Sequence, residues 1–328
     1  MTLSVSKEAA AGHHAIAGIP LVLGGNVFGW TATGDEGLAV LDAFYEAGGR
    51  MIDTADVYSA WIPGHKGGES ESFIGEWLSS RGVRSEMRIH TKTGMLSRNK
   101  ATQLGGPGDP DLYRPEEVLI SLDASLERLQ TDYLDLYYAH RDYAELPMAD
   151  IVAAFDGAVK TGKVREIGAS NFTAERLTAA LDAAEATDAT PFTMLQNQYN
   201  LVARDDYGAD LQRLCVERGI GMLPFFGLAA GYLTGKYRKP ADFEQGNRGY
   251  RVKDYAVSGV PVLAELDRIA DETGATLPAL ALAWLVRQPG IPAPIASART
   301  VAQLEEILPF IDLELSDDQL ARLTSAGT

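Results

Sequence analysis

Four polar side chains directly follow predicted strands, and their chemical types fit together. Asp53 ends the run MID, Tyr58 follows it in DTADVY, Lys92 follows MRIHT, and His140 follows YLDLYYA. A phenol with a pKa of about 10 donates a proton poorly at neutral pH unless a neighbouring cation favours the phenolate. An ammonium would do this, a carboxylate would keep the ammonium charged and aimed, and an imidazole would polarise a carbonyl. The combination predicts protonation of an oxygen that has just gained negative charge, as hydride transfer to a carbonyl requires.

Each of these residues also has an ordinary structural interpretation. Asp53 could cap a turn, and Tyr58 could be a half-buried aromatic with its hydroxyl in water. Lys92 could be a surface charge, and His140 could be a core histidine. Only the combination of types favours chemistry. A weaker alternative is an isomerase or aldolase in which Lys92 forms a Schiff base.

The sequence alternates short aliphatic runs with segments of helical period, and this alternation must position the four side chains. Two clear helical segments are Pro115–Leu129 and Met148–Thr161, and several helices are predicted to end at a glycine. The aliphatic runs begin at Leu21, Met51, Met87, Tyr133, Val164, Met194, Gly221 and Ile291. Alternation of this kind implies an α/β protein with parallel strands and right-handed crossovers.

Eight such units in one chain favour a single (β/α)8 TIM barrel with a C-terminal helical extension over a doubly wound open sheet. In both folds, catalytic groups follow the C-terminal ends of the strands. We expect residues 19–328 to form this domain. We assign no structure to the N-terminal tail, residues 1–18.

Composition excludes several classes of function. The 29 basic and 45 acidic residues give a net charge of −16, which is unfavourable for binding nucleic acid or an anionic membrane. Cys215 is the single cysteine, so an intrachain disulfide and a cysteine-based metal site are excluded, and we predict no metal. The N-terminus lacks the apolar core of a signal peptide, and no uncharged stretch is long enough to span a bilayer. These features predict a cytoplasmic protein.

Familiar nucleotide and hydrolase motifs are missing from the sequence. The turn after the first predicted strand reads GGNVFG, which is not the dinucleotide fingerprint GxGxxG. The stretch GAVKTGK nearly matches a P-loop, but Val164 stands where a Ser or Thr hydroxyl should bind Mg²⁺. The sequence has neither the GxSxG nor the HExxH motif.

The chain resembles the aldo-keto reductase family over nearly its whole length, from about residue 21 to 323. The family's Asp, Tyr, Lys and His tetrad matches Asp53, Tyr58, Lys92 and His140 in order and in local setting (DTADVY, TKTG, LDLYYAH). The resemblance implies a barrel that binds NADPH or NADP+ in an extended form without the fingerprint. It implies that Tyr58 is the general acid, Lys92 its pKa modulator, Asp53 the partner of the lysine and His140 the orienting group. The stretch GYLTGKY is similar to the longer-looped branch that includes the voltage-gated potassium channel β-subunits.

The resemblance also implies a nicotinamide site at the later strand ends. Ser170 and Asn171 in IGASNF, with Gln196 in LQNQYN, match the residues that hydrogen-bond the carboxamide. Phe225 replaces the family's usual tyrosine and keeps a ring face for stacking on nicotinamide. Lys236 matches a lysine that contacts the pyrophosphate. The remaining positions implied for this part of the cofactor are Gly25, Asn26, Val27, Asp53, Phe226, Gly227, Leu228 and Gly231.

The other end of the cofactor is predicted to bind near the C-terminus. The stretch IASARTVAQLEEI resembles the family segment that binds the adenosine 2′-phosphate, and its matching residues are Ser297, Arg299, Gln303 and Glu306. A guanidinium beside a helix N-terminus suits a phosphate. Ile307 replaces the asparagine that usually contacts adenine, so the phosphate contact is retained and the adenine contact is weakened.

We expect the substrate to be a small carbonyl compound, but its identity and the oligomeric state are open. Trp30, Trp61 and Phe28 could form an apolar wall for an aldehyde or could be ordinary packing aromatics. The polar loop over residues 238–257, with Arg248 and Arg251, could clamp the cofactor phosphates or could be mobile. The favoured function is NADPH-dependent carbonyl reduction. The alternative is a cofactor-bound regulatory subunit that binds a partner protein and turns over slowly.

Overall fold

Eight parallel strands form one sheet in the computed structural model, which describes residues 12–96, 110–244 and 249–327. The strand order is β7-β6-β5-β4-β3-β2-β1-β8, so sequence neighbours lie side by side. Two backbone bonds link the edges of this sheet: Met222 N–H donates to the Gly290 carbonyl at 2.8 Å, and Ile295 N–H to that of Pro224 at 2.9 Å. The sheet therefore curls into the predicted (β/α)8 barrel. The strands are β1 (Val22–Gly24), β2 (Met51–Asp53), β3 (Arg88–Thr93), β4 (Leu134–Ala139), β5 (Val164–Ser170), β6 (Met194–Gln196), β7 (Gly221–Met222) and β8 (Ile295–Ala296).

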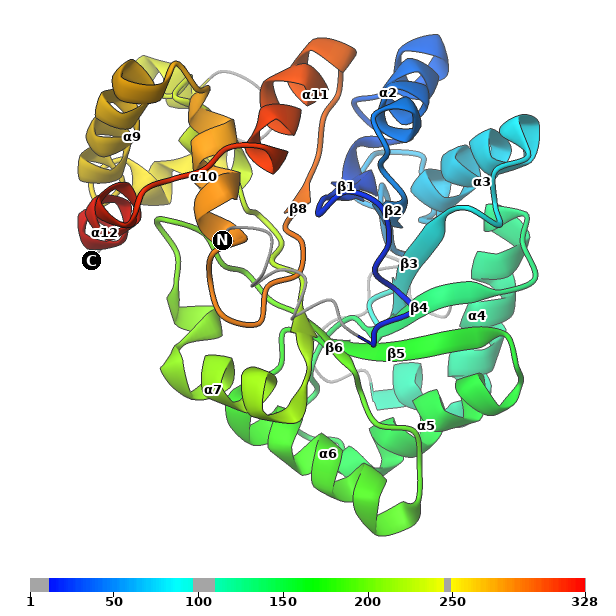
Figure 1. Ribbon diagram of the computed structural model, residues 1–328. Helices are drawn as coiled ribbons and strands as arrows, with labels where there is room; N and C mark the ends of the chain where they lie inside the picture. Colours follow the sequence, from blue (N-terminus) through cyan, green and yellow to red (C-terminus); the bar gives the residue numbers. More distant parts are fainter. Residues whose placement is uncertain (1–11, 97–109, 245–248, 328) are drawn as a thin grey trace.

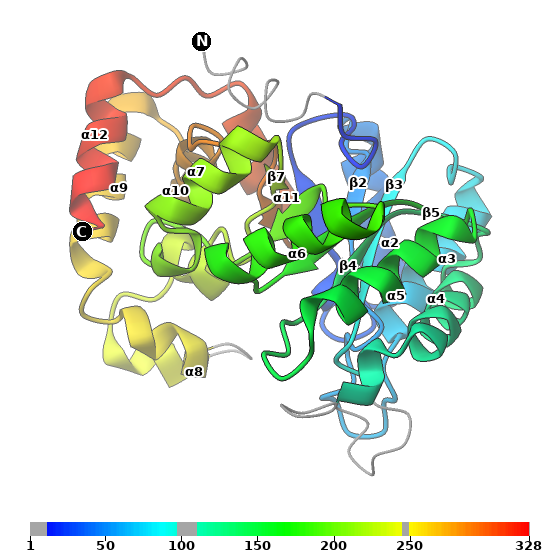
Figure 2. The same ribbon diagram turned by 90° about the horizontal axis from the view of Figure 1, so that it is seen from below.

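One α-helix follows each of the first six strands and lies on the outside of the sheet (Figures 1 and 2). These helices are α2 (Gly34–Glu46), α3 (Glu69–Arg81), α4 (Pro115–Leu129), α5 (Met148–Lys160), α6 (Ala174–Thr187) and α7 (Ala209–Arg218). The connection from β7 to β8 holds η4 (Ala229–Thr234), η5 (Pro240–Glu244), α8 (Gly249–Val252), η6 (Lys253–Tyr255), α9 (Val260–Thr273) and α10 (Leu277–Leu285). After β8 come α11 (Val301–Ile307), η7 (Leu308–Ile311) and α12 (Asp317–Ala326), which packs against α9 as the predicted C-terminal extension.

Short 3-10 helices shape the remaining connections. They are η1 (Gly25–Val27), η2 (Pro110–Tyr113) and η3 (Asp205–Tyr207). Glycine ends several of the outer helices, as predicted: Gly82, Gly162 and Gly219 all have positive φ, a conformation that costs little without a Cβ. The chain can therefore reverse and enter the next strand at once.

The core has two parts because strand side chains alternate between the faces of the sheet. In β4, Leu136 and Tyr138 belong to the cluster inside the barrel, together with Met51 and Met194 from other strands. Tyr137, by contrast, belongs to the larger cluster that includes the helix side chains. The interior is thus packed with side chains, which leaves the strand ends as the place for a site.

Residues 12–18, part of the tail to which the sequence assigned no structure, lie against the N-terminal halves of β3–β5. The backbone N–H of His14 donates to Glu166 Oε1 at 2.7 Å, and its Nε2 lies 2.9 Å from Asp135 Oδ1. The Ala15 carbonyl lies 2.9 Å from Nε2 of the buried His90. This segment therefore covers the end of the barrel opposite the C-terminal strand ends.

The segment over residues 238–257, predicted as a polar loop, contains η5, α8 and η6 instead. It is held against other loops: Gln198 Nε2 donates to Tyr255 Oη at 3.0 Å, and the Arg251 guanidinium lies 5.5 Å from the Phe226 ring centre. Arg248 lies outside the described residues. Among the helices that are described, none is both long and apolar enough to cross a membrane.

Candidate active site

Lys92 is the centre of the polar group at the C-terminal strand ends. It stands near the end of β3, and its side chain is completely buried. Its ammonium donates to Asp53 Oδ2 at 2.6 Å, to the Thr54 carbonyl at 2.8 Å and to the Tyr58 hydroxyl at 3.1 Å. An ammonium has three donors, so each acceptor takes one. Three of the four residues predicted to act together are therefore in direct contact.

Charge pairing keeps the buried Lys92 protonated. Burial alone would lower its pKa, but the Asp53 charge and then the Tyr58 oxygen outweigh burial, so the pKa is raised above its ordinary value. A buried charge of this kind is tolerated only when it is paired and hydrogen-bonded. The site thus holds a permanent cation at hydrogen-bond distance from a phenol.

Tyr58 is half-buried and faces the aromatic and imidazole side chains of neighbouring loops. Its ring centre lies 6.1 Å from that of His140 and 6.1 Å from that of Trp61, both in edge contact. The next residue, Ser59, is buried with a φ of 72°, a conformation uncommon for residues other than glycine. Strain of this kind is tolerated where the surrounding structure fixes it, and here it turns the chain directly after the phenol.

His140 follows β4 and is buried, with 9% of its surface exposed. Its pKa lies well below the ordinary 6.5, because burial disfavours the imidazolium and the charges of Lys92 and Arg141 disfavour it further. The ring is therefore neutral at neutral pH. Its buried Nδ1 has no hydrogen-bond partner among the residues that the structure describes. A neutral imidazole beside a phenol suits hydrogen bonding to an oxygen bound between them.

A continuous chain of hydrogen bonds joins the predicted carboxamide residues to Asp53. The Asn171 amide nitrogen donates to Ser170 Oγ at 3.0 Å, and Ser170 Oγ donates to the Gln196 carbonyl at 2.8 Å. The Gln196 side chain then donates from Nε2 to Asp53 Oδ1 at 2.8 Å. The sequence did not suggest this last contact, which fixes the carboxylate oxygen that Lys92 leaves unused.

On the other side of the mouth, β1 and β8 end in close contact. Ser297 Oγ lies 2.9 Å from Asn26 Oδ1, so two predicted cofactor residues meet. A Cβ at Gly25 would lie 2.8 Å from the Asp53 carbonyl, so only glycine fits where η1 passes the end of β2. Backbone that lacks a side chain at such a point can approach a ligand closely. Val27, by contrast, is buried in the core.

The remaining predicted cofactor residues lie on the loop after β7 and on α11. Phe225 and Phe226 are half-buried and touch edge to face, with ring centres 5.2 Å apart, and they precede Gly227, Leu228 and Gly231. Lys236 follows η4 and is exposed. Arg299 and Glu306 are exposed at α11, and Gln303 Oε1 accepts from the Arg299 backbone N–H at 3.0 Å. The Gln303 side chain thus bonds within its own segment, whereas the Phe226 ring lies 5.5 Å from the Arg251 guanidinium.

Of the three loop aromatics that could form a wall or pack in the core, Trp30 and Trp61 contact each other near Tyr58. Trp61 is 42% exposed, and its ring lies in edge contact with those of Trp30, at 5.6 Å, and Tyr58. Phe28 does not belong to this group, because it is fully buried and stacks on Phe73 at 5.5 Å. Hydrophobicity alone could not separate a loop aromatic that packs inward from one that faces solvent.

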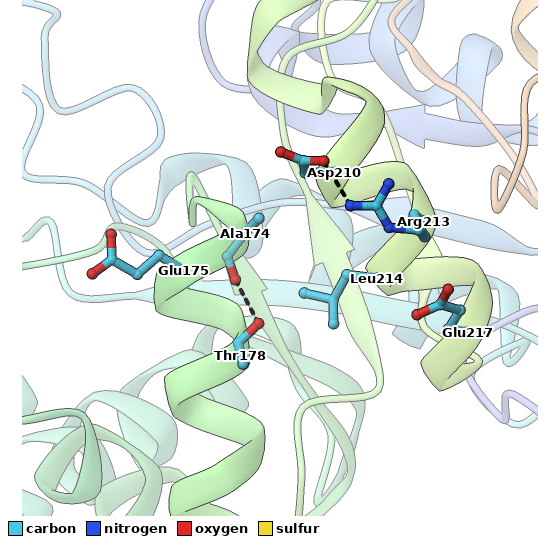
Figure 3. Close-up of a pocket in the computed structure, with 7 residues that line it drawn as sticks. All are labelled: Ala174, Glu175, Thr178, Asp210, Arg213, Leu214 and Glu217. Carbon is cyan, nitrogen blue, oxygen red and sulfur yellow. Dashed lines mark hydrogen bonds and ion pairs between the residues drawn. The ribbon is translucent and has the colours of Figure 1, made fainter.

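Two surface hollows, of about 350 and 410 Å³, lie elsewhere, between α6 and α7. Figure 3 shows the smaller one, where Asp210 pairs with Arg213 across from Thr178. Glu175 and Glu217 also line it, which makes it unfavourable for a phosphate. Neither hollow is lined by a tetrad residue, so the chemistry of the strand ends and not the size of a hollow locates the site.

The sequence is similar to those of known proteins. The aldo/keto reductase family model matches residues 20–328. The norsolorinic acid reductase stcV of Emericella nidulans is 31% identical over 322 residues, which cover 93% of this chain and 78% of the relative. The aldo-keto reductase str7 of Strobilurus tenacellus is 31% identical, covering 90% of this chain and 82% of the relative. The NADP(+) aryl-alcohol dehydrogenase of Phanerodontia chrysosporium is 28% identical, covering 86% and 73%.

Proposed function

Because the chain belongs to the aldo/keto reductase family, we propose that it is an NADP-dependent oxidoreductase that reduces aldehyde or ketone carbonyls to alcohols. The single observation that supports this reaction best is the buried Lys92 ammonium, 2.6 Å from Asp53 and 3.1 Å from the Tyr58 hydroxyl. The name of the Phanerodontia chrysosporium relative includes NADP(+), which supports the same cofactor here.

The residues at the strand ends fit a dinucleotide. The chain of hydrogen bonds from Asn171 to Asp53 would place a nicotinamide next to Tyr58. At Gly25, where a Cβ would lie 2.8 Å from the Asp53 carbonyl, the backbone passes the same strand ends closely. Arg299 at α11 would bind the 2′-phosphate. When bound, NADPH supplies the hydride that reduces the carbonyl carbon. That the protein binds no metal stays a prediction.

The protein's own part is to hold the carbonyl and to deliver a proton. Tyr58 donates its hydroxyl proton to the carbonyl oxygen as negative charge develops there, which leaves a phenolate. The Lys92 ammonium stabilises that phenolate, and Asp53 keeps the ammonium in place. His140, being neutral, donates a hydrogen bond to the same carbonyl oxygen and orients it.

The Schiff-base alternative is disfavoured by the same contacts. A Schiff base needs a neutral amine that can attack a carbonyl, but the pKa of Lys92 is raised and all three of its donors are engaged. The regulatory-subunit alternative predicts slow turnover with retained nucleotide. The similarity of GYLTGKY to the channel β-subunit branch stays a prediction.

We further propose that the preferred carbonyl is aromatic. The Trp61 ring lies in edge contact with the Tyr58 ring, and the Trp30 ring contacts Trp61 in turn, so a flat substrate at Tyr58 can make edge or stacked contacts with them. One relative is named an aryl-alcohol dehydrogenase, which supports the same class.

Steady-state assays with NADPH test these proposals. Benzaldehyde and cyclohexanecarbaldehyde are matched in size and differ in the aromatic ring. We expect NADPH oxidation with both, and a kcat/KM for benzaldehyde that is about 10-fold higher, worth about 1.4 kcal/mol of ring contact. Equal values would contradict the aromatic preference alone. Absence of turnover with every aldehyde and ketone, but with bound nucleotide, would favour the regulatory alternative.

A further inference from the structure

The short turn that follows β4, residues 140–141, is held by hydrogen bonds from three directions. The backbone N–H of His140 donates to the Thr93 carbonyl at 2.9 Å, and its carbonyl accepts from the Asn171 amide at 3.0 Å. The next residue, Arg141, has both backbone groups bound to one phenol. Its N–H donates to Tyr113 Oη at 3.1 Å, and Tyr113 Oη donates to its carbonyl at 2.7 Å. The backbone that carries the imidazole is therefore fully constrained.

Tyr113 is itself rigidly held. Its side chain is only 3% exposed, and its ring makes edge contacts with Tyr143 at 5.3 Å and Phe155 at 5.7 Å. The ring also fills the space beside Gly94, where a Cβ would lie 2.3 Å away. Burial raises the pKa of Tyr113 well above its usual range, so the hydroxyl stays protonated and can donate. A rigid phenol is thus lodged between the ends of β3 and β4.

We propose that Tyr113 is a positioning residue for the reduction, and that it acts by fixing the turn that aims His140 at the Tyr58 hydroxyl. Asn171 holds the same turn from the cofactor side. This inference rests on the proposed function, because it gives Tyr113 a role only through His140. Tyr113 touches Arg141 and not the tetrad side chains, so it is not a catalytic residue.

The physical reason is that any movement of a loop backbone also moves the imidazole that it carries. Without the hydroxyl, the Arg141 N–H and carbonyl would lie beside an apolar ring with no partner there, and the turn would move to satisfy them. Arg141 would move with it, and its guanidinium is one of the two charges that face His140. A displacement of about 1 Å at a reacting group can cost up to about 10²-fold in rate.

The test begins with Tyr113→Phe, which removes the hydroxyl and keeps the ring. We expect kcat/KM for an aldehyde to fall about 10-fold, with the NADPH Kd changed less than about two-fold. The matched control is Tyr207→Phe, because Tyr207 is also buried and donates to a backbone carbonyl, that of Pro289, at 3.0 Å. The control should keep full activity. Full activity in Tyr113→Phe would overturn the proposal.

A double-mutant cycle separates positioning from a general structural role. In a His140→Ala background, Tyr113→Phe should lower kcat/KM by less than about two-fold, since its target is already gone. The same 10-fold fall in both backgrounds would show that the hydroxyl acts by another route. If Tyr113→Phe does not fold, Asn171→Ala is measured instead, as kcat at saturating NADPH. Because Asn171 also belongs to the predicted carboxamide site, its kcat should fall by a larger factor with His140 present than in His140→Ala. An equal fold-change in both backgrounds would overturn the proposed role of the turn.

Histidine ring NMR keeps this test independent of the reaction. The chain has five histidines, and His140→Ala identifies the signals of residue 140. We expect these signals to shift or broaden in Tyr113→Phe and to stay unchanged in Tyr207→Phe. Unchanged signals in Tyr113→Phe would overturn the positioning role. Absence of turnover in the wild-type protein would overturn the proposed function and leave the NMR result valid.

Discussion

The two sides of the barrel mouth differ in how they hold a cation, which is buried and paired on one side and exposed on the other. On the β2–β4 side, Lys92 is completely buried and its three donors contact Asp53, Thr54 and Tyr58. On the α11 side, Arg299 is exposed to solvent, and its backbone N–H donates to Gln303 Oε1. The cation proposed to support proton transfer is part of the core, whereas the cation proposed to bind phosphate can reach a ligand without disturbing the fold.

This contrast predicts that one side of the mouth affects the stability of the fold and that the other side affects the affinity for the cofactor. Groups that stabilise developing charge work best when they are fixed in advance in a site that excludes water. A group that binds and releases a nucleotide is hydrated in between, so its removal costs the fold little. We therefore expect loss of charge on the first side to destabilise the protein, and loss of charge on the second side to change only cofactor binding.

The largest effect is expected for Lys92→Met, which keeps the length of the side chain and removes its charge. The free energy of unfolding should fall by about 3–5 kcal/mol, because Asp53 is left charged and buried without its cation. Aldehyde reduction should also be lost. Chemical denaturation followed by circular dichroism measures the first effect.

A matched pair on the surface provides the control. Lys163 and Asp123 are 2.7 Å apart, nearly the same as Lys92 and Asp53, but both are exposed. Lys163→Met should cost no more than about 1 kcal/mol. Adding Asp53→Asn to Lys92→Met should restore part of the stability and none of the activity. Equal losses for the two lysines would contradict the distinction between the two sides.

A smaller effect is expected for Arg299→Ala. The NADPH Kd should rise about 10-fold to 100-fold, as expected when one charge-assisted contact to a phosphate is lost, with no change in unfolding. Fluorescence titration with NADPH and NADH measures both cofactors, and the NADH Kd should not change. Arg213→Ala removes an exposed charge from α7 and should leave both values unchanged. A similar rise in the NADH Kd would show that Arg299 does not act through the 2′-phosphate.

The smallest effect concerns pH and again belongs to the buried side. The folded pKa of His140 is lowered by burial, then by Lys92 and Arg141, and that of the buried His90 is lowered chiefly by burial. Below 6.5 the unfolded chain therefore binds more protons than the folded protein, and the free energy of unfolding falls as the pH drops. The slope should be at most about 1.4 kcal/mol per pH unit for each histidine.

Denaturation between about pH 7.5 and pH 5.5 measures this slope. His140→Gln should reduce the slope by the part that His140 contributes, and Arg299→Ala should leave the slope as in the wild type. A slope that is the same in His140→Gln and the wild type would mean that the imidazole is not kept neutral by the fold.

The sequence was sufficient for the order of elements and for the polar residues that lie together at the strand ends. All eight predicted strands occur, because buried aliphatic runs between glycine-terminated helices leave few other arrangements. Asp53, Lys92 and His140 could be found since they are polar residues placed directly at or after such runs. Their meeting then follows from the barrel alone, because parallel strands end at one mouth.

Contacts between distant segments could not be predicted from one sequence. The Gln196 amide reaches Asp53 across 143 residues, and the His14 N–H reaches Glu166 across 152. Both depend on strand register and tilt, which periodicity does not specify. Phe28 could not be assigned to either of its two alternatives for the same reason: its place against Phe73 depends on how α3 packs, not on its own neighbours in sequence.

In the proposed mechanism, the Tyr58 hydroxyl is hydrogen-bonded to Lys92 and protonates the substrate. The decisive variant is Tyr58→Phe, with kcat for benzaldehyde and the NADPH Kd measured on the same preparation and Tyr207→Phe as the matched control. We expect kcat to fall by a factor of about 10² or more while the NADPH Kd stays nearly unchanged. Turnover equal to that of the wild type would show that Tyr58 is not the proton donor.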